Sequence, residues 1–119
     1  MNKISPKIQN QIGMLQQIQS QLQTVAGQKA QYEMAVREAR KATEELTELP
    51  EDSAVFMSVG TVMMQKKKEA VLKSLSEKIE TLELRIKSLE KQETLLQGKF
   101  EQLQTSIKQA LEGPATSAS

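Results

Sequence analysis

The side chains that could take part in chemistry in this chain are carboxylates, lysines and arginines, and neither histidine nor cysteine stands beside them. The 119 residues include 15 acidic and 16 basic ones. Imidazoles and thiolates are the usual bases, nucleophiles and zinc ligands, so the sequence excludes the chemistry they support. Most carboxylates stand at the spacing of charge pairs on helix faces, such as Glu33 with Arg37. No Gly-rich phosphate loop accompanies them. We therefore expect a protein that is not an enzyme and needs no cofactor.

The net charge and the hydropathy of the chain limit the kinds of partner that it could bind. The formal net charge is +1 with both signs interspersed, so no broad basic field for nucleic acid is expected. No apolar run approaches the length of about 18 residues that a membrane helix needs, and the sequence opens without an apolar signal segment. A chain without cysteine fits a reducing compartment. We expect a cytoplasmic protein with neither a nucleic-acid nor a membrane partner.

Two long stretches repeat apolar residues at heptad spacing, which is typical of coiled coils. The first follows a Ser-Pro helix start and predicts a helix over 5–48. The second predicts a helix over 66–112, and a Gly-Pro pair then leaves 113–119 as a flexible tail. The seam positions of the first helix are Ile4, Ile8, Gln11, Leu15, Ile18, Leu22, Val25, Lys29, Tyr32, Val36, Ala39, Thr43 and Leu46. Those of the second are Leu72, Leu75, Ile79, Leu82, Ile86, Leu89, Glu93, Leu96, Phe100, Leu103, Ile107 and Ala110.

Between the two helices the period of the apolar residues changes. Segment 53–65 places β-branched and other apolar residues around a central glycine, which predicts a β-hairpin turning at Val59-Gly60. If the chain folds there, the a positions of each helix face the d positions of the other. The sequence therefore predicts a single domain over 1–119, dominated by α-helix. Its fold is a long antiparallel two-helix coiled coil with a β-hairpin between the helices.

The predicted hairpin would leave apolar surface uncovered on an isolated chain, because a two-stranded sheet has two open edges. We interpret this surface as a subunit interface, where hairpins from several chains form a common sheet or barrel. A hairpin that folds back as a cap on its own helices is the alternative. The interface residues are Val55, Phe56, Met57, Val59, Gly60, Val62, Met63 and Met64.

A second apolar group lies beside the seam at the ends of the helices farthest from the hairpin in sequence. Methionine and isoleucine adapt to irregular partner surfaces, so this tip could bind another protein. A wider seam at a fraying end is an equal alternative. The tip residues are Ile4, Ile8, Ile12, Met14, Ile107 and Leu111.

Charged residues stand at two further places of interest. The triplet Lys66-Lys67-Lys68 is interpreted as a solvated first turn of the second helix. Lys29 and Glu93 occupy seam positions in adjacent layers, and we predict that they pair. Two unrelated polar interruptions that reach solvent are the alternative.

The order of these segments resembles the prefoldin family, in its archaeal beta-subunit type. The resemblance covers nearly the whole chain. Its most specific parts are the segments 49–60, LPEDSAVFMSVG, and 78–85, KIETLELR. A single hairpin, where the alpha class has two, points to the beta class. Phe56 stands where the family often has tyrosine, a change of little consequence because both rings are planar and apolar.

This resemblance implies a hexamer of two alpha and four beta subunits. The hairpins would assemble into a β-barrel body, from which the coiled coils project. Such an assembly is a chaperone that holds unfolded polypeptides at the tips without ATP and passes them to a group II chaperonin. A structural coiled-coil tether or adaptor is the alternative function.

Overall fold

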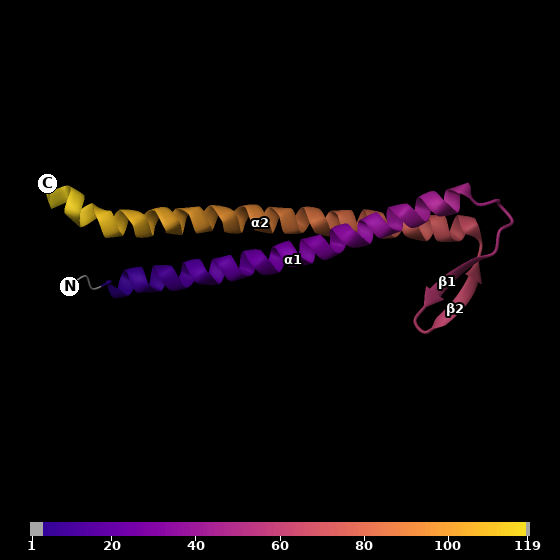
Figure 1. Cartoon of the computed structure of the whole chain (residues 1–119), viewed down its shortest axis with the longest axis horizontal. Helices are drawn as coiled ribbons and strands as arrows, with labels where there is room; N and C mark the ends of the chain where they lie inside the picture. Colours follow the sequence, from indigo (N-terminus) through magenta and orange to yellow (C-terminus); the bar gives the residue numbers. More distant parts are fainter. Residues whose placement is uncertain (1–3, 119) are drawn as a thin grey trace. The chain divides into compact units, whose positions relative to one another are not determined.

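The computed structural model describes the backbone of residues 4–118 and the side chains of residues 4–112. Two helices and two strands follow one another along the chain, with the strands between the helices (Figure 1). These elements are α1 (Pro6–Glu48), β1 (Val55–Val59), β2 (Val62–Lys66) and α2 (Lys68–Ala118). The predicted fold class, a helical pair with one β-hairpin between its helices, is confirmed.

Helix α1 begins and ends where its local chemistry dictates. Ser5 caps the amino end, because its Oγ accepts a hydrogen bond from Ile8 N at 3.2 Å. Pro6 follows as the first helical residue, a position where its missing N–H costs nothing. At the carboxyl end, Leu49 N donates to Leu46 O at 3.1 Å and tightens the last turn before Pro50.

Strands β1 and β2 pair in antiparallel register, with Val55 opposite Lys66 and Val59 opposite Val62. The turn therefore consists of Gly60 and Thr61, one residue later than the predicted Val59-Gly60. Gly60 has a φ of 61°, in the left-handed region that two-residue hairpin turns require and glycine adopts without strain. The turn position was wrong by one residue because Val59 has a pairing partner and its β-branched side chain favours strand.

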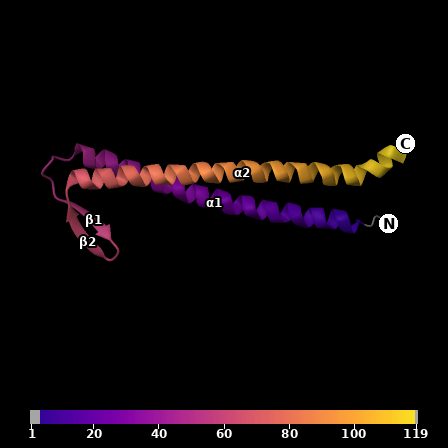
Figure 2. The ribbon, with the colours of Figure 1, turned by 180° about the vertical axis from the view of Figure 1, so that it is seen from behind.

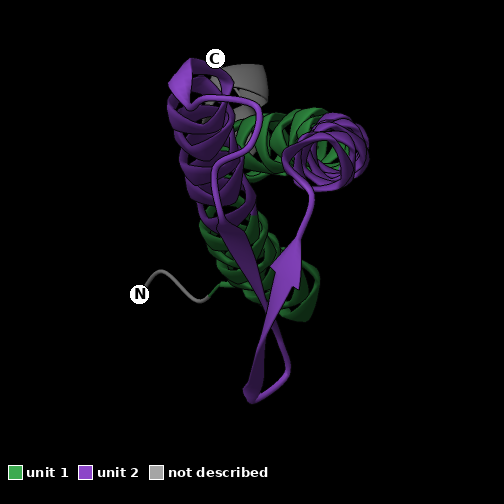
Figure 3. Cartoon of the chain, turned by 90° about the vertical axis from the view of Figure 1, so that its right-hand side faces the viewer, with its two compact units in different colours: residues 1–28, 89–119 green, residues 29–88 purple. Residues whose placement is uncertain are grey.

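The chain divides into two compact units (Figure 3). Unit 1 comprises residues 1–28 and 89–119, and unit 2 comprises residues 29–88. The buried apolar residues of unit 1 are Ile18, Val25 and Leu89. Those of unit 2 are Val36, Ala39, Val55, Val71 and Leu82. All of them except Val55 and Val71 stand at predicted seam positions.

In unit 2 the two helices run antiparallel, and side-chain contacts show the direction. Arg40 Nη2 of α1 lies 3.0 Å from Glu83 Oε2 of α2. The Arg85 guanidinium lies 5.8 Å from the ring centroid of Tyr32, so a later residue of α2 meets an earlier one of α1. The hairpin leaves from the adjoining ends of the helices, as the view from behind also shows (Figure 2).

Helix α2 is longer than the sequence predicts, because it continues to Ala118 instead of ending at residue 112. Gly113 and Pro114 therefore lie inside the helix, and the prediction of a tail over 113–119 is wrong as far as Ala118; Ser119 lies outside the described residues. A helix already formed adds residues without a new nucleation cost.

Candidate functional site

The hairpin carries the largest group of exposed apolar side chains in unit 2. Val62 is 57% exposed and Met63 is 68% exposed, and no residue of β2 is buried. We call the exposed apolar residues of the two strands the hairpin surface. Its members are Phe56, Val59, Val62, Met63 and Met64. Of the other predicted interface residues, Val55 is buried, Met57 is half-buried and Gly60 forms the turn.

The two faces of the hairpin differ in polarity. Side chains alternate between faces along a strand, and directly paired residues share a face. The register therefore groups Met57 with Met64 and Val59 with Val62 on one face, which is apolar apart from Lys66 at its end. The opposite face pairs Phe56 with Gln65 and Ser58 with Met63, so it is mixed. Within the described residues each strand has one neighbour, and its other edge keeps unpaired backbone groups.

The predicted tip residues all lie in unit 1, where they separate into two classes of exposure. Ile4, Met14 and Leu111 are exposed. Ile8, Ile12 and Ile107 are half-buried. A hollow of about 370 Å³ opens beside Ile8, and its lining places Ile8 near Ala110, a predicted seam residue of the second helix. The lining residues are Lys7, Ile8, Gln11, Ser106, Gln109 and Ala110.

Gln11 places an amide in the seam of this tip. Its Oε1 is the one buried side-chain oxygen or nitrogen that has no hydrogen-bond partner among the residues whose side chains are described. A buried acceptor without a donor costs about 1–3 kcal/mol relative to a solvated one. The seam is therefore weaker at Gln11 than at the apolar layers that follow it.

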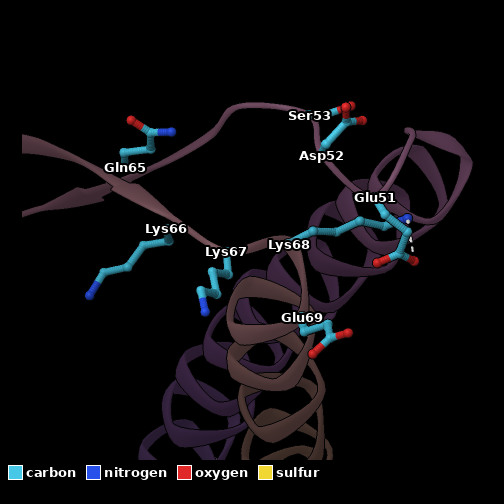
Figure 4. A pocket seen from close by; sticks show the side chains of 8 residues that line it. All are labelled: Glu51, Asp52, Ser53, Gln65, Lys66, Lys67, Lys68 and Glu69. Atoms are coloured by element: carbon cyan, nitrogen blue, oxygen red, sulfur yellow. Dashed lines mark ion pairs between the residues drawn. The ribbon is translucent and has the colours of Figure 1, made fainter.

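The junction between the helices and the hairpin contains a residue that the sequence interpretation missed. Lys68 is only 9% exposed, so it does not belong to a solvated first turn. Lys66 instead ends β2, and Lys67 and Lys66 point away from Lys68 in the close view of the hollow they line (Figure 4). Lys68 Nζ donates to Leu49 O at 2.8 Å and to Thr47 O at 3.3 Å.

One signal in the sequence could have identified Lys68. The last turn of α1 contains no basic residue, so its free carbonyl groups lack the local cation that commonly stabilises a helix end. A lysine at the first position of the next helix stands where the helix dipole disfavours a cation. In the folded chain, the lysine at the start of α2 supplies the cation that the carboxyl end of α1 lacks.

The predicted pair Lys29 and Glu93 remains a prediction. Both side chains are half-buried, as expected for charged residues at seam positions. Lys29 lies in unit 2 and Glu93 in unit 1.

Two features are absent from the part of the chain that the structure describes. No group of three or more acidic side chains there is arranged to hold a metal ion. Neither of its helices is long and apolar enough to cross a membrane.

Comparison with known proteins gives one consistent result. The family model described as prefoldin subunit matches residues 9–113. The prefoldin subunit beta of Methanospirillum hungatei is 58% identical over 98% of this chain and 97% of its own length. That of Methanoculleus marisnigri is 67% identical over 95% of this chain and 93% of its own. The crystal structure of the prefoldin beta subunit from Thermococcus strain KS-1 superposes with a TM-score of 0.86 at 40% identity, covering 93% of this chain and 97% of that one. The chain therefore belongs to the prefoldin family, among its beta subunits of archaeal type.

Proposed function

We propose that this chain is one subunit of an ATP-independent chaperone that captures unfolded polypeptides at the coiled-coil tips and passes them to a group II chaperonin. Members of the family are non-enzymatic chaperone components that form hetero-oligomers with alpha subunits. The proposed assembly contains two alpha and four beta subunits and works in the cytoplasm, with hairpins joined in a β-barrel body.

The exposed hairpin surface is the observation that carries the assembly part of this proposal. Its five apolar side chains stand on strands with open edges, a combination that costs solubility unless another chain covers it. A second strand pair would satisfy the free backbone groups and bury the apolar face in one step. A tether or adaptor needs no such hairpin, so this feature favours the chaperone over that alternative.

The capture part rests on the tip residues. The exposed Ile4, Met14 and Leu111 offer little apolar area, so one tip alone would bind a client weakly. Several tips on one body raise the effective concentration for the second contact and produce tight but reversible holding. Half-buried tip residues add area if the seam opens at Gln11.

One experiment tests both parts. The chain is mixed with an alpha-type subunit, its mass is measured by light scattering, and the assembly is added to a chemically denatured protein diluted from denaturant without ATP. We expect a hexamer mass and suppressed aggregation of the denatured protein. A defined oligomer that leaves aggregation unchanged would favour the tether or adaptor instead.

The control for the tip compares two double variants of the same assembly. Ile12→Ser with Leu111→Ser removes apolar tip side chains. Gln16→Ser with Gln104→Ser changes two exposed polar residues of the same helices. Only the first should weaken the suppression of aggregation.

A further inference from the structure

Lys68 joins two parts of the chain that lie on either side of the hairpin. Its ammonium contacts Thr47 O, at the carboxyl end of α1, and Leu49 O, just beyond it. The Glu51 carboxylate lies 3.9 Å from Nζ, on the linker that leads to β1 (Figure 4). The hairpin thus lies in the sequence between Leu49 and Lys68, and a hydrogen bond joins these two residues.

The two hydrogen bonds to carbonyl groups hold Lys68 in place more strongly than the ion pair with Glu51 does. Glu51 is 81% exposed at its side chain, and an ion pair of that exposure contributes little. Thr47 O belongs to the last turn of α1, where carbonyl groups have no intrahelical partner, and Leu49 O follows directly after the helix. The lysine that binds both of them is buried. A charged donor strengthens a hydrogen bond, and the helix dipole favours a cation at the carboxyl end of a helix. Both hydrogen bonds of Lys68 are therefore stronger than those of a neutral donor would be.

The linker is held by its own backbone as well. Ser53 N donates to Pro50 O at 3.1 Å, and Leu49 N donates to Leu46 O at 3.1 Å. On the far side of the hairpin, Val71 N donates to Lys67 O at 3.1 Å and begins α2. The Lys68 side chain connects these two short ordered segments, so its loss would remove two hydrogen bonds between them at the base of the hairpin.

We propose that Lys68 is a positioning residue that sets the direction in which the hairpin leaves the helices and so prepares it for joining other hairpins. The inference rests on the proposed role of the hairpin in assembly. We call the hydrogen bonds of Lys68 with Thr47 O and Leu49 O the clamp. A surface held in its bound direction loses less conformational freedom on association. Removal of the clamp should therefore weaken assembly although the hairpin surface itself is unchanged.

Three variants test the clamp in the full chain mixed with an alpha-type subunit. Lys68→Met keeps an unbranched stem and removes the donors. Lys68→Gln keeps a shorter donor. Lys67→Met is the matched control, because it removes the same charge from an exposed neighbour. Amide hydrogen exchange over residues 51–57 reports on the linker and the start of β1, and light scattering over a dilution series reports on assembly.

We expect Lys68→Met to accelerate linker exchange about tenfold and to weaken assembly about tenfold relative to Lys67→Met, with far-UV helicity preserved. Lys68→Gln should fall between them. Linker exchange equal to that of Lys67→Met would overturn the clamp, and faster exchange with unchanged assembly would overturn its positioning role. If Lys68→Met loses helicity, the same two readouts on Lys68→Gln decide.

The proposed role of the hairpin has its own test, so the two failures are distinguishable. Val62→Asp changes the hairpin surface and leaves the clamp in place. A Val62→Asp chain that still assembles rejects the assembly role, and with it the positioning role. A Val62→Asp chain that dissociates, beside a Lys68→Met chain that assembles normally, rejects only the positioning role.

Discussion

Val62→Asp is the sharpest perturbation of the hairpin surface. Val62 lies in β2 on the apolar face, directly opposite Val59 and beside the turn, and 57% of it is exposed on a single chain. Burying a whole valine side chain contributes about 1.5–3 kcal/mol, so covering the exposed part contributes about 1–1.5 kcal/mol. Aspartate forfeits this contribution and adds a desolvation cost of at least about 2 kcal/mol if its charge is enclosed. The expected loss of about 3–4 kcal/mol per hairpin weakens association by a factor of ~10²–10³.

The assay for this variant is a mass measurement by light scattering with the alpha-type subunit present, together with far-UV circular dichroism. The mass should fall to that of single chains or small species, while helicity stays close to that of the unmodified chain because both helices are intact. Thr61→Asp is the matched control, since it places the same charge at the neighbouring exposed turn residue. A Val62→Asp chain that keeps the hexamer mass would refute the reasoning and indicate a hairpin that packs only on its own helices.

Three further predictions concern the tip and the seam. Ile12→Ser with Leu111→Ser should reduce the suppression of client aggregation severalfold while the oligomer mass holds; equal protection by this variant would move capture away from the tip. Gln11→Leu should stabilise the chain by about 1–2 kcal/mol in thermal unfolding, because it removes an unpartnered buried acceptor; a lower melting temperature would contradict the assignment of that acceptor. A double-mutant cycle of Lys29→Met and Glu93→Leu should give a coupling of at most about 1 kcal/mol, and a coupling of zero within error would reject the pairing.

The heptad pattern predicted most of the core because a coiled-coil seam depends on local spacing alone. Ile18 and Val25 in unit 1, and Val36, Ala39 and Leu82 in unit 2, are buried at positions assigned from that spacing. The hairpin was also predictable, since a change from helical to strand-like period around a glycine is a local signal. The exact turn was not, because Val59 could serve as a turn residue or as the last paired residue until its partner Val62 was placed.

Lys68 could not be placed by the same means because its partners are distant in sequence. Its acceptors stand 19 and 21 residues before it, beyond any helical period, and a lysine triplet next to a helix start usually faces solvent. The extension of α2 through Gly113 and Pro114 was missed for a different reason. Both residues are strong local stop signals, so local sequence predicts an end at residue 112, whereas the 51-residue helix continues to Ala118.

The hairpin and the tip differ in how much apolar surface they expose. In the proposed mechanism this implies that subunits bind one another more strongly through the hairpin than a client binds to the tip. The hairpin combines five exposed apolar side chains with unpaired strand edges, so each association buries area and completes backbone hydrogen bonds together. The tip has three exposed apolar residues on a helical scaffold whose backbone is already bonded, so a client gains side-chain contacts alone. Assembly should therefore persist through many cycles of capture and release. A chaperone that hands its client onward without ATP needs this order of affinities, since a tip as adhesive as the hairpin would retain the client it must release.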